Sequence, residues 1–213
     1  SSFKISATQV TQKQYQAVMK TNPSHFKEKA QQDSGNLPVE NVNWNDAMVF
    51  CEQLTKKLKG KYKVTFPTEA QWEYAARGGH KAEVDEDGVH VGKLKYAGSN
   101  KLDEVGWYTE NSGGKTHSVR SKKPNELGLY DMSGNVWEWC RDWYDENFYK
   151  ECHKEGIVEN PVCTKKGSFR VVRGGSWDNY AEICRSADRR RCNPVGRRNR
   201  VGFRLVFVPQ FTL

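Results

Sequence analysis

The segment from Arg173 to Arg204 constrains this chain most, because it is long and lacks a regular pattern. Glycine and aromatic residues mark its two ends, Arg173-Gly174-Gly175-Ser176-Trp177 and Val201-Gly202-Phe203-Arg204. Between them the residues are polar and mostly charged, with little helical or strand periodicity, which is typical of loops. A loop of this length inside a compact domain is uncommon unless it is functional. We therefore expect an irregular surface segment that carries the function.

The charge of the chain points in the same direction. The 213 residues have a formal net charge of +8. Much of the excess is arginine, at positions 185, 189, 190, 191, 197, 198, 200 and 204. Such clustering marks nucleic-acid or anionic-surface binders, and a solvated basic surface explains it equally well. No groove-reading helix is predicted among these arginines, which disfavours a nucleic-acid binder.

Six cysteines, at positions 51, 140, 152, 163, 184 and 192, form no Cys-x-x-Cys pair. A zinc ribbon or a thioredoxin-type site is therefore disfavoured. Cys152 and Cys163 flank a polar loop and could form a disulfide, whereas Cys51 lies on the apolar face of a predicted helix and is expected in the core. No apolar run is long enough to span a membrane. The chain starts at Ser1 without Met, so the absence of a signal peptide says little about its compartment.

Capping patterns and apolar periodicity predict three helices, over residues 11–19, 44–58 and 68–77. Residues 1–10 are expected to form an extended entry strand, and residues 62–66, 170–172 and 203–207 further strands. Residues 21–42 and 80–125 contain turn residues and are expected to be mainly loop. Neither a domain boundary nor an internal repeat is evident. The sequence therefore predicts one α+β domain over residues 1–213, with much irregular structure.

Four motifs, in this order, carry a family resemblance: Phe66–Gly79, Gly128–Trp139, Arg173–Trp177 and Val201–Arg204. They resemble motifs of the formylglycine-generating enzyme (sulfatase-modifying factor) family. That resemblance implies a single irregular domain related to the C-type lectin fold, with few helices, short strands and many loops. It does not by itself fix the function, because a fold can serve several.

The oxidases of that family resemble copper enzymes that use two cysteines five residues apart, between the Gly-Gly-Ser motif and a downstream Arg-x-Ala-x-Arg. Thiolates suit Cu(I), so both sulfurs are needed. In this chain that interval holds only Cys184, and Cys192 lies beyond it. The iron-ligand histidine motif of the sulfoxide-synthase relatives is missing as well. We therefore expect no catalytic residues and no enzyme, and keep a formylglycine-type copper oxidase as the alternative.

The 173–204 segment also resembles the variable region of proteins diversified by retroelements. The resemblance implies fixed residues interleaved with positions where the template has asparagine codons. Those positions form the predicted ligand-binding set: Asp178, Asn179, Tyr180, Ile183, Asp188, Arg190, Arg191, Cys192, Asn193, Val195, Gly196, Arg198, Asn199 and Arg200. Glu182 belongs to the same set, although it requires a different template codon or is fixed.

A diversified site needs a scaffold whose stability is independent of the varied side chains, so we expect these to be exposed. The fixed residues should hold the backbone: Gly174, Gly175, Trp177, Arg185, Ala187, Arg189, Pro194, Gly202 and Phe203. Tyr and Arg dominate binding hot spots, so this variant should prefer an acidic protein or surface ligand. The resulting hypothesis is a monomeric, non-enzymatic display protein at the cell surface or outside the cell, attached through a lipid anchor beyond this chain.

The resemblance to the formylglycine-generating enzyme family also implies a structural calcium ion. Side-chain oxygens of Asp131 and Glu138 and backbone carbonyls of Gly134 and Val136 would bind it. Such a mixture of carboxylate and carbonyl oxygens suits Ca²⁺. The alternative is a turn stabilised by the Asp131 side chain, with Glu138 in a nearby ion pair.

Overall fold

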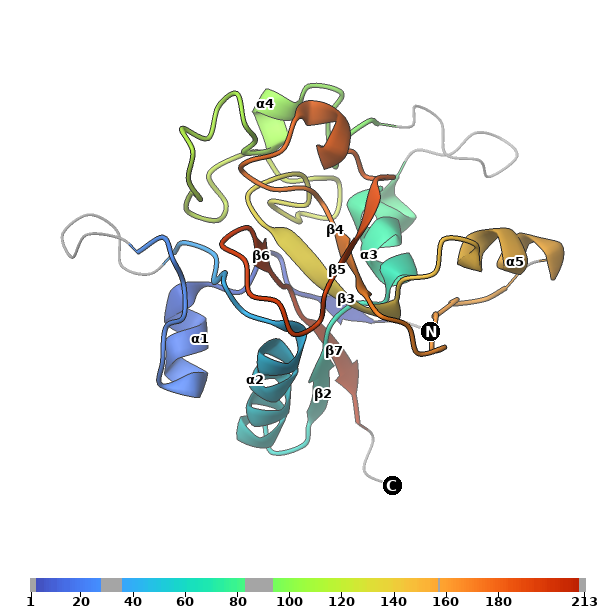
Figure 1. Ribbon diagram of the computed structural model, residues 1–213, viewed down its shortest axis with the longest axis horizontal. Helices are drawn as coiled ribbons and strands as arrows, with labels where there is room; N and C mark the ends of the chain where they lie inside the picture. The colour runs from blue at the N-terminus through green and yellow to red at the C-terminus, as the bar shows by residue number, and fades with distance from the viewer. Residues whose placement is uncertain (1–2, 28–35, 83–93, 157, 211–213) are drawn as a thin grey trace.

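A computed structural model describes residues 3–27, 36–82, 94–156 and 158–210. Two small sheets form its centre (Figure 1). The first has the order β1-β7-β2 and comprises Lys4–Ile5, Val206–Pro209 and Tyr62–Thr65. The second has the order β5-β4-β3-β6 and comprises Arg189–Cys192, Arg170–Arg173, Trp137–Trp143 and Val201–Gly202. All pairs are antiparallel except β3 with β6.

The helices lie around these sheets, joined by long irregular connections (Figure 1). They are α1 (Gln12–Met19), α2 (Trp44–Lys57), α3 (Glu69–Ala76), α4 (Leu102–Val105) and α5 (Phe148–Lys154), with short 3₁₀ turns η1 (Gly79–Lys81) and η2 (Ala181–Cys184). This arrangement is the mixed α+β single domain that the sequence predicts. Within the described part of the chain, no helix has both the length and the apolar composition needed to cross a membrane.

The three predicted helices are confirmed, and their first turns explain why. Thr11, Asn43 and Thr68 are the N-caps of α1, α2 and α3. Each side chain accepts a hydrogen bond from the backbone N–H three residues on, and the side chain at that position accepts one from the cap's own N–H. Two otherwise unsatisfied donors are thereby paired at each helix start.

The strand predictions are confirmed in part. Residues 62–65 and 170–173 form β2 and β4. Of the predicted strand at 203–207 only Val206 and Phe207 belong to a strand, β7, and β6 lies just before this range; the entry strand pairs only through Lys4 and Ile5. The sequence missed β3 because both of its faces are buried, which removes the alternating pattern. It missed α5 too, and the expected irregularity of the 173–204 segment is wrong at β5 and η2.

The main hydrophobic core is aromatic. Phe50 and Phe66 both pack edge to face against Phe203, at centroid distances of 5.4 and 5.6 Å. All three side chains are nearly inaccessible to solvent. Cys51 lies in this core as predicted. All six cysteines are free thiols in the structure, so the disulfide considered between Cys152 and Cys163 is not present.

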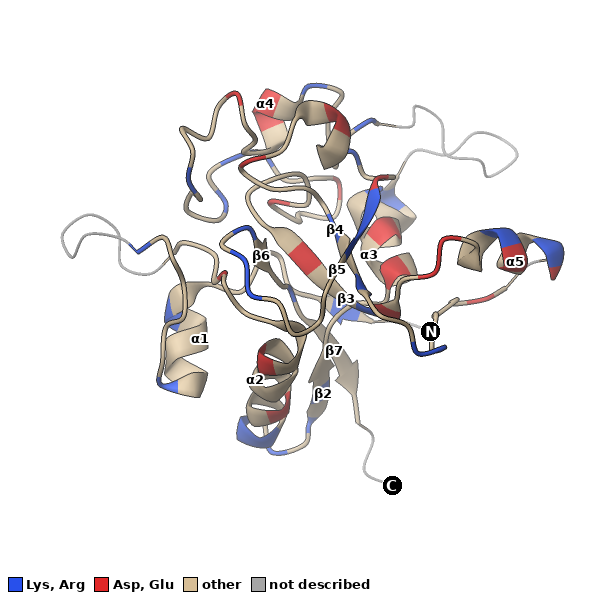
Figure 2. Cartoon of the chain, viewed as in Figure 1, with Lys and Arg blue, Asp and Glu red and all other residues tan. Residues whose placement is uncertain are grey.

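Buried carboxylates fix the 173–204 segment at its start, middle and end. Arg173 and Arg189 both pair with Glu69 of α3, at 2.9 and 2.7 Å. Arg204 pairs with Glu138 of β3 at 2.6 Å. Figure 2 shows these acidic positions on α3 and β3 beside the basic strand β5. Arg189 and Arg204 therefore do not belong to a surface charge cluster, contrary to the expectation from sequence.

The substitution Glu69→Gln tests how strongly this anchoring stabilises the fold. Breaking a buried ion pair leaves an uncompensated charge, so we expect the free energy of unfolding to fall by about 3–5 kcal/mol. Urea denaturation followed by tryptophan fluorescence measures this change. Glu104→Gln, which removes an exposed pair with Lys123, is the matched control and should have little effect. Equal losses in the two variants would contradict the proposed role of Glu69.

Candidate ligand-binding site

The 173–204 segment leaves β4 through two glycines and returns to the sheet as β5 and then β6. Gly174 and Gly175 have φ angles of +99° and +78°, in the left-handed region that favours glycine. A Cβ atom on Gly175 would lie 2.5 Å from the Cys184 sulfur. The Gly-Gly motif therefore allows the chain to turn tightly over η2 and raise the following residues above the sheet.

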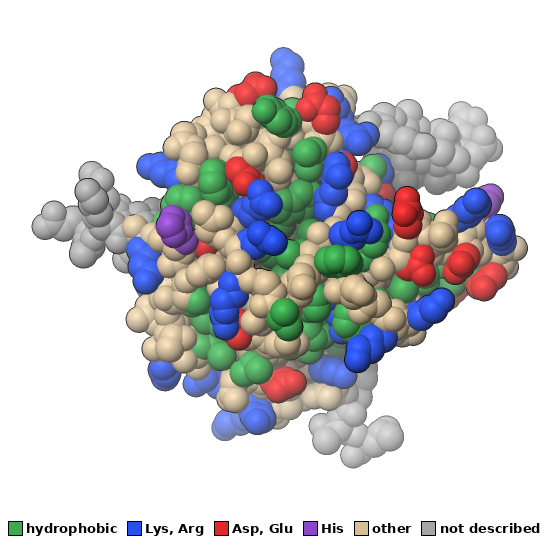
Figure 3. All heavy atoms as spheres, in the orientation of Figure 1, with side chains coloured by type: hydrophobic (Ala, Val, Ile, Leu, Met, Phe, Trp, Pro, Cys, Tyr) green, Lys and Arg blue, Asp and Glu red, His purple; other side chains and the backbone are tan. Residues whose placement is uncertain are grey.

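A hollow of about 260 Å³, here called the variable hollow, opens in this segment. Its floor is formed by Trp137, Val172 and Val201, from β3, β4 and β6. The other lining residues all belong to the predicted varied set: Asn179, Ile183, Arg190, Arg191, Cys192, Arg198 and Arg200. Figure 3 shows basic side chains on both sides of an apolar surface in the middle of this face. The sheet thus supplies the floor, and the varied residues supply the walls.

The predicted exposure of the varied positions agrees with the structure at all but one of them. Seven are exposed: Tyr180, Glu182, Arg190, Arg191, Asn193, Val195 and Arg198. Seven are partly exposed: Asp178, Asn179, Ile183, Asp188, Gly196, Asn199 and Arg200. Cys192 is the exception, at 8% exposure, because it ends β5 and packs against the main core.

The fixed residues behave less uniformly. Gly174, Gly175, Gly202 and Phe203 are buried, as a role in holding the backbone requires. The indole N–H of Trp177 donates to the Asn199 carbonyl at 3.1 Å, which ties the two arms of the segment together. Arg185 and Ala187 are exposed, so burial does not hold their side chains. Arg185 still bonds locally, since its Nε donates to the Glu182 carbonyl.

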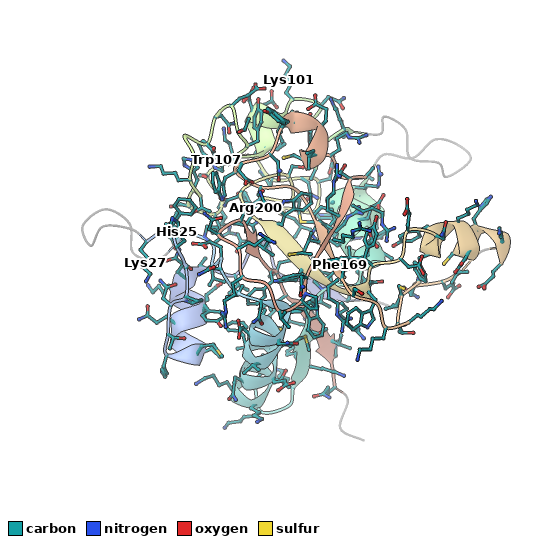
Figure 4. The ribbon with its side chains drawn as sticks, viewed as in Figure 1. His25, Lys27, Lys101, Trp107, Phe169 and Arg200 are labelled. Carbon is teal, nitrogen blue, oxygen red and sulfur yellow. The ribbon has the colours of Figure 1, made fainter. Side chains whose placement is uncertain are left out.

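The four arginines of the variable hollow differ in what neutralises them. Arg190 pairs with Asp188 at 2.8 Å, and Arg200 pairs with Asp178 at 2.7 Å. Arg191 instead lies over the rings of Phe169 and Tyr144 at 5.2 and 5.4 Å, and Arg198 lies beside the Cys192 thiol. Neither makes an ion pair with any residue that the structure describes. In Figure 4 Arg200 and Phe169 both lie near the middle of the view, with Phe169 to the right of and below Arg200.

The two thiols of the segment, Cys184 and Cys192, do not form a copper pair. Cys184 packs with Tyr96 and Leu102 in a small cluster, whereas Cys192 belongs to the main core. Burial raises the pKa of Cys184 to about 12, and burial also raises the pKa of Cys192. Neither sulfur is therefore a thiolate near neutral pH, which is the form that binds Cu(I) or acts as a nucleophile.

The four residues predicted to bind calcium do converge, but on a side-chain amide. Nε2 of Gln9 lies 3.2 Å from the Asp131 carbonyl, 2.9 Å from the Val136 carbonyl and 3.0 Å from Oε1 of Glu138. The Gly134 carbonyl is 3.5 Å away. An amide nitrogen thus occupies the position at which these oxygens could share a cation.

The carboxylates at this position have other partners too. Glu138 accepts hydrogen bonds from Arg204 and from the indole N–H of Trp72. Asp131 turns its carboxylate away and accepts from the Arg120 N–H, so its carbonyl, and not the predicted side-chain oxygen, faces Gln9. In this orientation of the Gln9 amide a calcium ion does not fit, and Gln9 Oε1 and Asp131 Oδ1 are left buried without a hydrogen-bond partner among the described residues. Sequence reasoning missed Gln9 because it lies 122 residues from Asp131 along the chain.

A family model for the sulfatase-modifying factor enzyme 1-like domain matches residues 1–208. The chain belongs to this family. Among its relatives, the chaperone protein LppX of Paenibacillus barcinonensis is 33% identical, over 86% of this chain and 73% of the chaperone. The formylglycine-generating enzyme of Streptomyces coelicolor is 34% identical over 79% of this chain, which spans about half (52%) of that enzyme. The family thus includes members with different functions.

Among solved structures, Treponema denticola variable protein 1 is similar over nearly the whole domain. It superposes with a TM-score of 0.79 at 34% sequence identity, covering 97% of this chain and 84% of that protein. The resemblance to a variable protein, noted from the 173–204 segment, is therefore matched by the three-dimensional structure of this sulfatase-modifying factor family member.

The place of Gln9 predicts how this family member responds to calcium. The melting temperature of the unaltered chain should be the same in calcium and in chelator, because an amide occupies the centre of the oxygens. Gln9→Ala removes a donor shared by four buried acceptors and should lower the melting temperature by several degrees. Calcium should restore part of that loss, since the oxygens are then free to bind it.

Scanning calorimetry in calcium chloride and in EDTA checks both statements. The neighbouring exposed substitution Lys4→Ala, which leaves these oxygens untouched, is the control and should show no calcium response. A higher melting temperature of the unaltered chain in calcium would show instead that Gln9 yields its place to the ion.

Proposed function

We propose that this chain is a non-enzymatic ligand-binding protein whose site is diversified by a retroelement. One observation carries the proposal: seven of the ten residues that line the variable hollow are predicted varied positions. The three others are apolar residues of the sheet floor, Trp137, Val172 and Val201. Replacing the varied residues would therefore change the walls of the hollow and leave its floor in place. Antibody loops bind by the same division between scaffold and loop.

The direction of the arginine side chains supports the same division. Arg173, Arg189 and Arg204 are fixed residues, and they pair with buried carboxylates. Arg190 and Arg191, which follow Arg189 in β5, are predicted varied positions and are exposed. Substitutions at exposed positions typically change stability by within about 0.5 kcal/mol, so the site tolerates variation.

We further propose that the partner of this variant is an acidic protein or surface ligand. Arg191 and Arg198 support this, because they face the hollow without a carboxylate partner among the described residues. A ligand carboxylate there would form charge-assisted hydrogen bonds, which are stronger than neutral ones. Display at the cell surface through a lipid anchor beyond this chain, as a monomer, belongs to the same proposal.

The alternatives have less support. A formylglycine-type copper oxidase would require paired thiolates, whereas Cys184 and Cys192 lie in different buried clusters. A nucleic-acid binder would require an element that reads a groove, whereas the basic residues here surround a hollow. DNA binding with a steep salt dependence would revive that alternative.

The genome tests the diversification directly. We expect a near-repeat of the DNA encoding residues 173–204, with asparagine codons at the varied positions, beside a reverse transcriptase gene. Sequencing the flanking region checks this. A region without such a repeat would overturn the retroelement part of the proposal and leave the binding part to be judged separately.

The preference for acidic ligands can be tested with poly-L-glutamate as the probe. We expect binding that weakens as salt is added. The double variant Arg191→Gln/Arg198→Gln should bind about tenfold more weakly, because it removes the arginines that lack partners. Biolayer interferometry measures both affinities.

The double variant Arg190→Gln/Arg200→Gln is the matched control. It lowers the net charge by the same amount but removes arginines that already pair with Asp188 and Asp178. Its affinity should fall clearly less. Equal losses in the two double variants would mean that overall charge, and not the arrangement of the site, attracts the probe.

A further inference from the structure

A second hollow, here called the constant hollow, lies beside the variable one. It has a volume of about 290 Å³ and is lined by Trp44, Met48, Arg141, Trp143, Val162, Cys163, Thr164 and Arg170. None of these residues belongs to the 173–204 segment. The ligand preference of this hollow is therefore set by residues outside the predicted varied positions.

The two hollows are neighbours through the backbone. Arg170 of the constant hollow is the sheet partner of Cys192, which lines the variable hollow. The backbone N–H of Trp44 donates a hydrogen bond to the Pro194 carbonyl at 3.0 Å. Phe169, labelled in Figure 4, precedes Arg170 and contacts Arg191. A ligand extended across this face could therefore occupy both hollows.

The guanidinium of Arg170 is held rigidly between two indole rings. Its central carbon lies 3.9 Å from the ring centroid of Trp44 and 3.6 Å from that of Trp143. One terminal nitrogen, Nη1, donates to the Arg141 carbonyl at 2.6 Å. These contacts fix the plane of the guanidinium, so little side-chain entropy remains to be lost when it binds a ligand.

This fixed cation has a carboxylate nearby, that of Asp142, but forms no ion pair with it. Arg170 makes no ion pair within the described parts of the chain, and its Nε is buried without a hydrogen-bond partner there. The nearby Asp142 uses its two oxygens to accept from the N–H groups of Glu69 and Cys163. Burial accordingly lowers the pKa of Arg170 from its usual value. Arg141, exposed at the rim, adds a second positive charge.

We propose that the constant hollow binds a carboxylate attached to an apolar group, supplied by an acidic segment of a partner polypeptide. Arg170 and Arg141 pair with the carboxylate. Trp44, Trp143 and Met48 contact the apolar group. A planar carboxylate matches the fixed plane of the guanidinium, and aromatic walls suit an apolar neighbour. The site concerns residues outside the 173–204 segment, so it stands or falls independently of retroelement diversification.

The test uses the indole N–H signals of the chain labelled with ¹⁵N-tryptophan, assigned by single Trp→Phe variants. The first probe is N-acetyl-L-leucine, which has a carboxylate and an apolar side chain. We expect the Trp44 and Trp143 signals to shift together and to saturate at millimolar concentration. The neutral isostere N-acetyl-L-leucinamide should leave both unshifted. Trp137, on the floor of the variable hollow, reports binding there instead.

A second probe distinguishes the source of the carboxylate. N-acetyl-L-leucyl-L-glutamate α-amide carries only a side-chain carboxylate. If it shifts Trp44 and Trp143 more strongly than N-acetyl-L-leucine, the hollow takes an acidic side chain. The reverse order assigns it a C-terminal carboxylate. Either result supports the proposal.

Variants test the role of the arginines. Arg170→Gln should weaken binding of the acid by about tenfold, and Arg141→Gln by about threefold. Lys166→Gln, an exposed basic residue outside the hollow, is the control and should bind normally. The signal of the buried Trp72 shows that each variant is folded.

The proposal is overturned if the Trp44 and Trp143 signals do not shift, if the acid and the amide shift them equally, or if only Trp137 shifts. Equal shifts with inorganic phosphate would also overturn it, because the hollow would then recognise negative charge without recognising a carboxylate.

Discussion

The structure depends on two buried carboxylates, Glu69 and Glu138, and the arginines that neutralise them. Glu69 joins α3 to Arg173 and Arg189, and Glu138 joins β3 to Arg204. Unpaired, each charge would be costly inside the protein, so each pair forces its two elements together. These ion pairs attach the 173–204 segment to the rest of the domain at three points, Arg173, Arg189 and Arg204.

The arginines that attach the segment are therefore different from those that we propose to contact a ligand. The arginines that point inward are fixed residues, whereas those around the variable hollow are at varied positions and exposed or partly exposed. Cys192 is the point at which the separation is incomplete, because it lines the hollow and also packs against the core. A polar residue there would be buried with few partners, at a cost of about 1–3 kcal/mol. Variation at this position is therefore constrained in size and polarity in a way that variation at Val195, which is 65% exposed, is not.

Local signals in the sequence were sufficient for α1, α2 and α3 and insufficient for most of the second sheet. Thr11, Asn43 and Thr68 start helices through bonds to residues three positions away, which a single window of sequence contains. In contrast, Glu138, the second residue of β3, is buried with its charge paired only because Arg204, Trp72 and Gln9 reach it from distant parts of the chain. The varied positions come from the family resemblance of the 173–204 segment and stay a prediction, whereas the hollow they line could not be predicted, since its floor comes from three separate strands. The same limit applies to the calcium prediction, which named the four residues that converge but assigned the side-chain oxygen of Asp131 instead of its carbonyl and could not identify Gln9.

The two hollows together explain how one scaffold could serve many variants. A diversified site must give each new set of side chains some chance of binding, although most sets have no designed complement. On our proposal the constant hollow contributes a modest, invariant affinity for acidic segments, held at a fixed distance from the walls that vary. Two weak contacts on one ligand combine more strongly than either alone, because binding at the first raises the effective concentration at the second. The arginine-rich walls of this variant share the charge preference of the constant hollow, so both parts of the face would select the same kind of partner. Variants with other walls would then differ in which acidic segment they bind, while Arg170 and its two tryptophans keep the class of ligand the same.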